Sequence, residues 1–165
     1  MRQEVKFECK SINADGTFVG LGAVYNNVDL GGDMILPGSF TKTIAEKGGQ
    51  VPLLMGHDTR APIGLARLMD SPEGLMVHGK LVLGADGATS AYSLLKAGVI
   101  KGLSIGYDTI KSVMDGGVRK LSELKLWEIS LTPFPMNERA TITSVKGDDQ
   151  IRQFRALLAE CKRAF

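Results

Sequence analysis

The feature that most constrains this chain is a succession of short segments with strand character, separated by clusters of glycine, asparagine, aspartate and proline. These segments cover residues 4–10, 17–25, 51–55, 63–69, 75–83, 102–107, 118–132 and 140–145. Period-two alternation is typical of half-buried strands, and frequent turn residues favour antiparallel pairing. About seven or eight short strands with two inserted helices predict an α+β fold, a closed or nearly closed, mainly antiparallel β-barrel.

The length of the chain agrees with one core domain. It has 165 residues, of which 44% are hydrophobic and 23% charged, as expected for a single sizeable core. We expect residues 1–146 to form the barrel domain and residues 147–165 an amphipathic helix. Its apolar stripe is Ile151, Phe154, Leu157, Leu158, Cys161 and Phe165. The stripe either packs on the barrel or docks on a partner chain, a second protomer or a scaffold.

Two helices are expected inside the barrel domain. Ser39 is the expected N-cap of a short helix that Gly48 and Gly49 end, and a second helix covers residues 85–97 before Gly98. The segment 26–37 is rich in glycine, asparagine and aspartate, but it lacks the ligand spacing of an EF-hand calcium loop. We interpret it as a turn-forming loop.

Charge and composition exclude several classes of partner. The formal net charge is +2, which gives no strong attraction to nucleic acid or to an anionic membrane. No apolar run approaches membrane-spanning length, and Met1–Glu4 leads into an alternating strand without a hydrophobic signal region, which predicts a cytoplasmic protein. Cys9 and Cys161 lack a metal-binding spacing and are expected to be free thiols.

A hydroxyl stands between two glycines in the segment Gly102–Tyr107, which otherwise has the character of a buried strand. Glycine two residues to either side of Ser104 lets other backbone approach closely, which suits attack on a substrate carbonyl. Ser104 is therefore the candidate nucleophile. The pattern is short and degenerate, and a small-residue strand in a tight part of a barrel has the same sequence.

The order of the histidines restricts the serine chemistry that is conceivable. The chain has two, His57 and His78, and both precede Ser104, which excludes the α/β-hydrolase order. The local signatures of chymotrypsin-like and subtilisin-like proteases are missing. His57 follows an apolar strand and Gly56, a placement that fits a general base but also a surface turn. His78 shares a strand face with Lys80, and we assign it no chemistry.

An acid lies inside the last long strand, between apolar neighbours. Glu128 shares one face with Leu124, Leu126 and Ser130, and a buried carboxylate without a partner is costly. The expected partner is His57, in the chain order histidine, serine, acid. Alternatively, Glu128 lies on an edge strand or forms an ion pair with Arg67, Arg119 or Arg139.

No cofactor is predicted, because the sequence has no glycine-rich phosphate loop, zinc spacing or dinucleotide fingerprint. A metal hydrolase built on Gly56, His57 and Asp58 is a conceivable alternative. It needs further ligands that two histidines scarcely supply.

Several ordered blocks of the sequence resemble the prohead proteases of tailed bacteriophages. The resemblance covers about residues 5–146 and is carried by residues 33–40, 51–58, 62–64, 102–107 and 127–132, with Pro135 and Asn137. That family is related in fold to the herpesvirus assembly proteases, which use a histidine, a serine and a second histidine in this chain order. Glu128 stands here where those enzymes have the second histidine.

The resemblance implies a serine endopeptidase inside the assembling procapsid in the host cytoplasm. Its implied substrates are the scaffolding segment of the major capsid protein precursor and the protease itself, with Ser104 as nucleophile, His57 as base and Glu128 as the orienting acid. The sequence does not identify the oxyanion donors; the candidates are backbone N–H groups of the turn 135–139, or Arg139, because this turn follows the strand that carries Glu128. A catalytically silent barrel that serves as a capsid scaffold or assembly chaperone is the alternative, because a shared fold does not establish activity.

Overall fold

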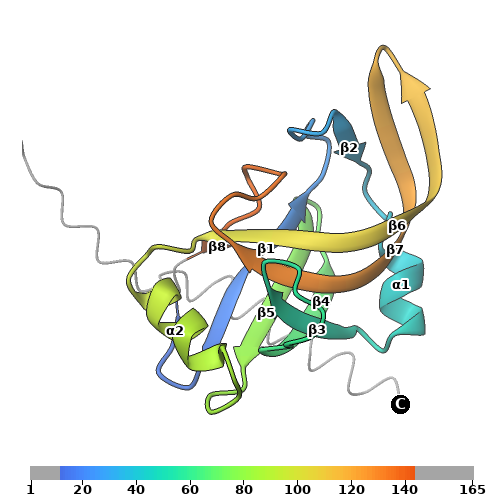
Figure 1. The fold of residues 1–165 in the computed structure, drawn as a ribbon. Helices are drawn as coiled ribbons and strands as arrows, with labels where there is room; N and C mark the ends of the chain where they lie inside the picture. Colours follow the sequence, from blue (N-terminus) through green and yellow to red (C-terminus); the bar gives the residue numbers. More distant parts are fainter. Residues whose placement is uncertain (1–11, 144–165) are drawn as a thin grey trace, which may run out of the picture.

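The computed structural model describes residues 12–143, which form a mostly-sheet α+β fold (Figure 1). In chain order its elements are β1 (Thr17–Val24), β2 (Asp33–Ile35), α1 (Thr41–Glu46), β3 (Gln50–Met55), β4 (Gly64–Asp70), β5 (Gly74–Leu81), α2 (Ala88–Lys96), β6 (Gly102–Asp115), β7 (Val118–Thr132) and β8 (Ile142–Thr143). Neither of these two helices is long and apolar enough to cross a membrane. The expected first strand, Cys9, Cys161 and the expected helix 147–165 lie outside the described residues.

The strands form one sheet in the order β2-β7-β3-β4-β5-β1-β8, with β6 paired to β7. Most pairs are antiparallel, while β2 and β3 both run parallel to β7. The continuous pairing stays open between β8 and β6. There an isolated bridge joins Gly102 to Thr141, and the Ile142 N–H donates to the Lys101 carbonyl (2.8 Å). The mostly-sheet mixed fold is thus present, whereas the sheet does not close as the predicted barrel would.

Strand β7 is the longest strand, with 15 residues, and its two edges have different partners. Strand β6 follows it along one edge, and the resulting hairpin extends beyond the rest of the sheet (Figure 1). On the other edge, β2 pairs with residues 119–121 and β3 with residues 129–131. Between them, the Leu124 N–H donates to the Ser39 carbonyl, and the Thr43 hydroxyl contacts the Leu124 carbonyl and the Leu126 N–H. Helix α1 therefore fills the gap along this edge.

The inward-facing residues of the strands form one hydrophobic core, because period-two alternation sends every second side chain inward. Strand β5 shows this, since Leu75, Val77 and Leu81 are buried. A side chain at Gly79 would collide with the ring of Phe18, which is fully buried. Helix α2 contributes Ala88, Ala91 and Leu95 to the same core. The site is therefore built on a packed sheet.

The expected N-cap at Ser39 is wrong. Helix α1 begins at Thr41 with Phe40 at the cap position. The Ser39 hydroxyl instead lies 2.5 Å from the Leu36 carbonyl and 2.8 Å from the Leu121 carbonyl. It joins the helix to β7, a partner 82 residues away that local sequence does not reveal. Gly48 and Gly49 end the helix with positive φ, as expected.

The segment 26–37 is more than a turn, because it contains strand β2. Its Asp33 side chain is buried and accepts hydrogen bonds from Arg119 Nε (2.7 Å) and Arg119 Nη2 (2.5 Å). The Tyr107 hydroxyl donates to the same carboxylate (3.3 Å). A bidentate pair of this kind fixes the relative orientation of the two side chains and also pairs their charges. It attaches the segment to the β6–β7 hairpin.

We predict that the Asp33–Arg119 pair stabilises the protein in a pH-dependent way. The hydrogen bond from Arg119 holds the pKa of the Asp33 carboxyl below its ordinary value. The contribution is therefore fully present above about pH 4, where the unfolded carboxyl ionises, and is lost as the pH falls through the folded pKa. Urea unfolding should show Asp33→Asn less stable than the wild type at about pH 7, and by a smaller margin at about pH 2.5.

The exposed acid Asp86 provides the control for this measurement. Asp86→Asn should leave the free energy of unfolding unchanged at both pH values. A deficit of Asp33→Asn that is equal at neutral and acidic pH would show that the charge pair does not act in this way.

Candidate active site

His57 follows β3 after one intervening residue, Gly56, in a turn that β7 holds in place. The Gly56 N–H donates to the Leu131 carbonyl (3.0 Å), which extends the parallel pairing of β3 and β7 by one residue. The His57 N–H donates to the Ser130 hydroxyl (2.9 Å). His57 has a φ of 63°, a left-handed conformation that is uncommon outside glycine and persists where surrounding contacts enforce it. The backbone thus presents the imidazole at the edge of the sheet.

Glu128 lies on β7, and only 6% of the residue is exposed to solvent. Its carboxylate contacts two side chains. Glu128 Oε1 lies 2.5 Å from His57 Nδ1, and Glu128 Oε2 accepts a hydrogen bond from the Ser130 hydroxyl (2.8 Å). Gly106 faces Glu128 across the β6–β7 pair, and any side chain at Gly106 would collide with this carboxyl group. The alternative partner Arg119 pairs with Asp33 instead.

Ser104 lies on β6, opposite Ser130 on β7. Its hydroxyl oxygen is 3.1 Å from His57 Nε2. The structure therefore brings the three candidate residues into one chain of contacts, from Glu128 through His57 to Ser104, although they come from three different strands or strand ends.

With an ionised Glu128, these contacts assign one role to each ring nitrogen of His57. An ionised carboxylate only accepts hydrogen bonds, so His57 Nδ1 carries a hydrogen and donates it to Glu128. In the neutral imidazole, Nε2 then has a lone pair and accepts the hydrogen bond from the Ser104 hydroxyl. This is the arrangement in which a serine can lose its proton to a base as it attacks a carbonyl.

Ser130 has a place in this site that the sequence did not reveal. It is fully buried, and its hydroxyl accepts from the His57 N–H while donating to Glu128. It thereby connects the backbone of the histidine to the carboxylate that contacts the ring. Its position on the Glu128 face of the strand was visible from the alternation, but the contact with His57 depends on the pairing of β3 with β7.

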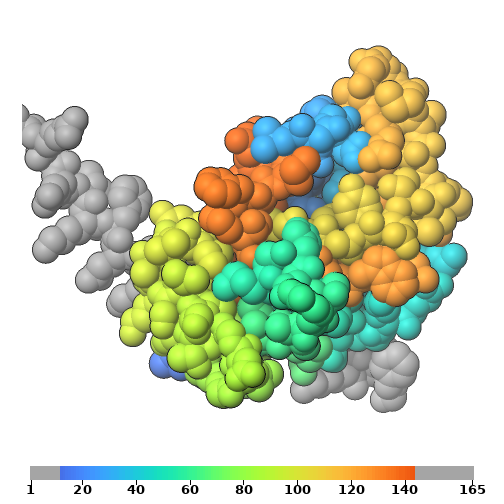
Figure 2. Space-filling view, viewed as in Figure 1, coloured from blue at the N-terminus to red at the C-terminus, as the bar shows by residue number. Residues whose placement is uncertain are grey.

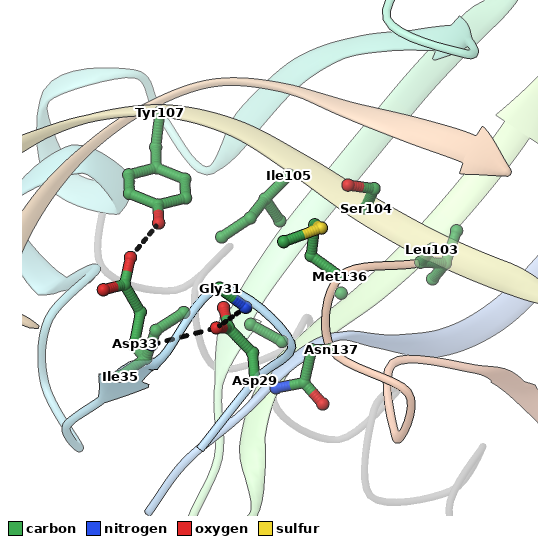
Figure 3. Close-up of a pocket in the computed structure, with 12 residues that line it drawn as sticks. Asp29, Gly31, Asp33, Ile35, Leu103, Ser104, Ile105, Tyr107, Met136 and Asn137 are labelled. Atoms are coloured by element: carbon green, nitrogen blue, oxygen red, sulfur yellow. Dashed lines mark hydrogen bonds between the residues drawn. The ribbon is translucent and has the colours of Figure 1, made fainter. Parts of the chain in front are cut away.

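A cavity of about 110 Å³ opens beside Ser104. Figure 2 shows the molecule hollowed on this side, between the blue segment that contains β2 and the orange segment after β7. Besides Ser104, its lining includes Asp33 and Tyr107 from one end, and Met136 and Asn137 from the turn after β7 (Figure 3). The nucleophile candidate is thus open to a space that can receive part of a substrate.

Tyr107 lies near the end of this cavity away from Ser104 (Figure 3). Burial and the nearby Asp33 and Asp29 charges raise the pKa of Tyr107 to about 12. Its hydroxyl therefore remains a hydrogen-bond donor at neutral pH.

The turn 135–139, which contains the candidate oxyanion donors, borders the cavity through Met136 and Asn137. Asn137 is buried, and its side chain accepts from Asn27 Nδ2 (3.2 Å) and donates to the Val24 carbonyl (3.3 Å). The Arg139 N–H donates to Asn137 Oδ1 (3.1 Å). That N–H is therefore engaged inside the turn.

His78 lies outside this site, and the described residues do not support the alternative of a metal hydrolase. His78 lies on β5, aligned with Val19 and Arg67 on the neighbouring strands, and lines a different hollow with Arg67 and Lys80. Within residues 12–143, no three His, Cys, Asp or Glu side chains are grouped so that they could hold a metal ion.

The sequence matches a family model and several curated proteins. The matching model is that of the caudovirus prohead serine protease, over residues 4–154. The prohead protease of Enterobacteria phage HK97 is 34% identical over 158 residues, which cover 92% of this chain and 69% of that protein. The capsid polyprotein of Pseudomonas phage PAJU2 is 32% identical over 139 residues, which cover 74% of this chain and 20% of the polyprotein.

Among solved structures, the fold is similar to that of KSHV protease in complex with a hexapeptide phosphonate inhibitor. The TM-score is 0.59 at 13% sequence identity, over 91% of this chain and 77% of that one. At this identity the similarity concerns the fold alone. The family match spans most of the sequence, and the HK97 relative is matched over more than two thirds of its length. The chain therefore belongs to the caudovirus prohead serine protease family.

Proposed function

We propose that this serine protease cleaves peptide bonds with Ser104 as nucleophile, His57 as general base and acid, and Glu128 as the group that orients the histidine. The observation that carries the proposal is the unbroken contact chain from Glu128 Oε1 to His57 and from His57 to Ser104. It ends beside the cavity that Ser104 itself lines.

The first half of the reaction forms an ester. Ser104 Oγ attacks the carbonyl carbon of the scissile bond while its proton passes to His57 Nε2. The resulting imidazolium is stabilised by Glu128, which stays ionised and holds the Nδ1 hydrogen. His57 then gives the Nε2 proton to the amine nitrogen, the C–N bond breaks, and the acyl group remains on Ser104.

The second half releases the acyl group. A water molecule gives a proton to His57 Nε2 and attacks the ester carbonyl, and the same proton returns to Ser104 Oγ as the C–O bond breaks. The negative oxygen that forms in each half needs nearby donors. We place them among the backbone N–H groups of the turn 135–139 other than that of Arg139, because this turn borders the cavity beside Ser104.

The protein has a protease role in phage procapsid maturation, as its family and relatives are named for it. We propose that its substrates are the scaffolding segment of the major capsid protein precursor and the protease itself, inside the assembling procapsid in the host. The similarity to a capsid polyprotein supports this substrate class. A silent barrel that serves as a scaffold or assembly chaperone would instead leave Ser104 without a chemical role.

We also propose that the isolated bridge between Gly102 and Thr141 brings the open edges of the sheet together into a nearly closed barrel. The Leu103 N–H donates to the Ala140 carbonyl (2.9 Å) beside this bridge, so the two segments already share hydrogen bonds on both sides of it. Such closure would hold the start of the Ser104 strand from both edges.

We predict that a serine-directed peptidyl phosphonate labels Ser104. Ser104→Ala should abolish peptide cleavage and labelling while leaving the circular dichroism spectrum and the unfolding midpoint unchanged, because only a small hydroxyl is lost. Mass spectrometry of the labelled protein identifies the residue. The matched control is Ser112→Ala, which lies on the exposed part of the same strand. Cleavage by folded Ser104→Ala would refute the assignment, and loss of wild-type cleavage with EDTA would favour the metal-dependent alternative. The silent alternative instead predicts that the folded wild type cleaves no peptide.

We predict that Glu128→Gln lowers kcat by about 10²–10⁴-fold while changing KM little. The amide retains the size of the side chain but removes the charge that stabilises the imidazolium, which matters in the reaction and not in substrate binding. Steady-state kinetics on one peptide separates the two constants. Glu123→Gln is the control, because this acid pairs with Lys111 and Lys42 outside the site. Equal kcat in wild type and Glu128→Gln would leave Glu128 a structural acid.

We predict that deletion after Lys146 leaves a folded protein that cleaves small peptides but associates less with itself or with capsid precursor. The proposal behind this prediction is that the stripe in 147–165 docks on a partner chain. Light scattering and co-sedimentation with capsid precursor measure the association. Unfolding of the truncated protein, or loss of peptide cleavage, would assign the segment to the core domain instead.

A further inference from the structure

The cavity beside Ser104 has two chemically different ends. Ser104 lines it together with its strand neighbours Leu103 and Ile105, and the carboxylates of Asp29 and Asp33 line it as well. Figure 3 shows Ser104 on one side of the space and the two carboxylates on the other, with Ile105 between them. A side chain that enters beside the nucleophile therefore points toward acidic groups.

Of the two carboxylates, Asp29 is the one without an ion pair, and the charge of Arg119 acts on it only from beyond ion-pairing distance. Asp33 accepts hydrogen bonds from both Nε and Nη2 of Arg119. Asp29 Oδ1 accepts hydrogen bonds from the Gly31 N–H (2.8 Å) and the Asp33 N–H (2.9 Å). Within residues 12–143 no cation lies at ion-pairing distance from Asp29.

The lining of the cavity contains two carboxylates and no lysine, arginine or histidine among its 12 residues. Arg119 offsets one of these charges from outside the lining, so a net negative charge faces the cavity. In a partly enclosed space such a charge attracts a cation more strongly than it does in open water.

The walls between the two ends are apolar. Ile105 and Met136 lie along the path from Ser104 to Asp29 (Figure 3), and Ile35 also lines the cavity. Since an apolar cavity of about 150 Å³ holds a benzene ring, one of about 110 Å³ holds a chain of about four or five heavy atoms. Lysine has an apolar stem of this length and a cationic tip.

We infer that this cavity binds the side chain of the residue directly before the cleaved bond, that this residue is basic, and that Asp29 is its counter-charge. The inference rests on the proposed function, because it takes Ser104 as the nucleophile. The residue whose carbonyl is attacked lies against the nucleophile, and the cavity that Ser104 lines is the space next to it. Lysine fits this volume better than the larger guanidinium of arginine.

The substitution Asp29→Asn tests the charge without disturbing the loop. Asparagine retains an Oδ1 that accepts the hydrogen bonds from Gly31 and Asp33, so the turn is kept while the charge is removed. Asp86→Asn is the matched control, because Asp86 is exposed and does not line the cavity.

The experiment uses the whole protein and a peptide library made from a digested proteome, with cleavage sites identified by mass spectrometry. Only cleavages absent from Ser104→Ala are counted. The wild type and Asp86→Asn should enrich basic residues, lysine above all, directly before the cut, and Asp29→Asn should lose this enrichment. On the best peptide, exchange of that lysine for norleucine, which has an uncharged side chain of similar length, should lower kcat/KM of the wild type at least about tenfold and that of Asp29→Asn little.

The outcomes separate the two proposals. Ser104-dependent cleavage without basic enrichment, or equal kcat/KM of the wild type for the lysine and norleucine peptides, overturns the inference and leaves the proposed function standing. A misfolded Asp29→Asn does not block the test, because the norleucine comparison uses the wild type. If no cleavage depends on Ser104, the proposed function fails and this inference fails with it.

Discussion

The parallel contact between the end of β3 and the end of β7 is the interaction on which the site depends. Through it the Gly56 and His57 N–H groups reach the Leu131 carbonyl and the Ser130 hydroxyl. These two bonds set the direction in which the imidazole leaves the backbone, and they hold His57 in its left-handed conformation. Parallel strands need a long connection between them. Here the intervening chain contains β4, β5, α2 and β6.

The rest of β7 supports that contact. Strand β6 pairs with it over most of its length, while β2, α1 and β3 occupy its other edge in turn. As a result, the carboxylates of Glu128 and Asp33 have different surroundings. Glu128 faces the gap that Gly106 leaves for it, whereas Asp33 is clamped by Arg119 from the β7 edge. One strand therefore positions both Glu128 and the loop that borders the cavity.

The elements were largely predictable because their signals are local. Alternation in β5, the glycines after α1, and the apolar run of β3 each act within a few residues. The candidates Ser104, His57 and Glu128 were named from strand position and chain order. Their distances were not predictable, because they depend on the register of β6 with β7 and of β3 with β7.

The wrong and missing predictions have the same cause, because they depend on contacts between segments that are distant in the sequence. Ser39 has the composition of an N-cap, yet its hydroxyl contacts Leu121 on a distant strand. Strand β2 has three residues, too few for a periodic signal, and it exists because β7 offers it an edge. The roles of Ser130 and Gly106 are likewise cross-strand effects, one a hydrogen bond and the other an open space.

The three contacting groups also differ in how far apart they are along the chain. Ser104 and Glu128 belong to one antiparallel hairpin, whose strands are consecutive in sequence, while His57 arrives from a strand that precedes it by many residues. Local pairings form at small loop-closure cost, and non-local parallel ones form late. The proposed nucleophile and acid can thus be assembled while the proposed base is still absent. With these roles, peptide cleavage would report on the long-range docking of β3, and a nascent or locally opened chain would carry a complete hairpin without an active serine.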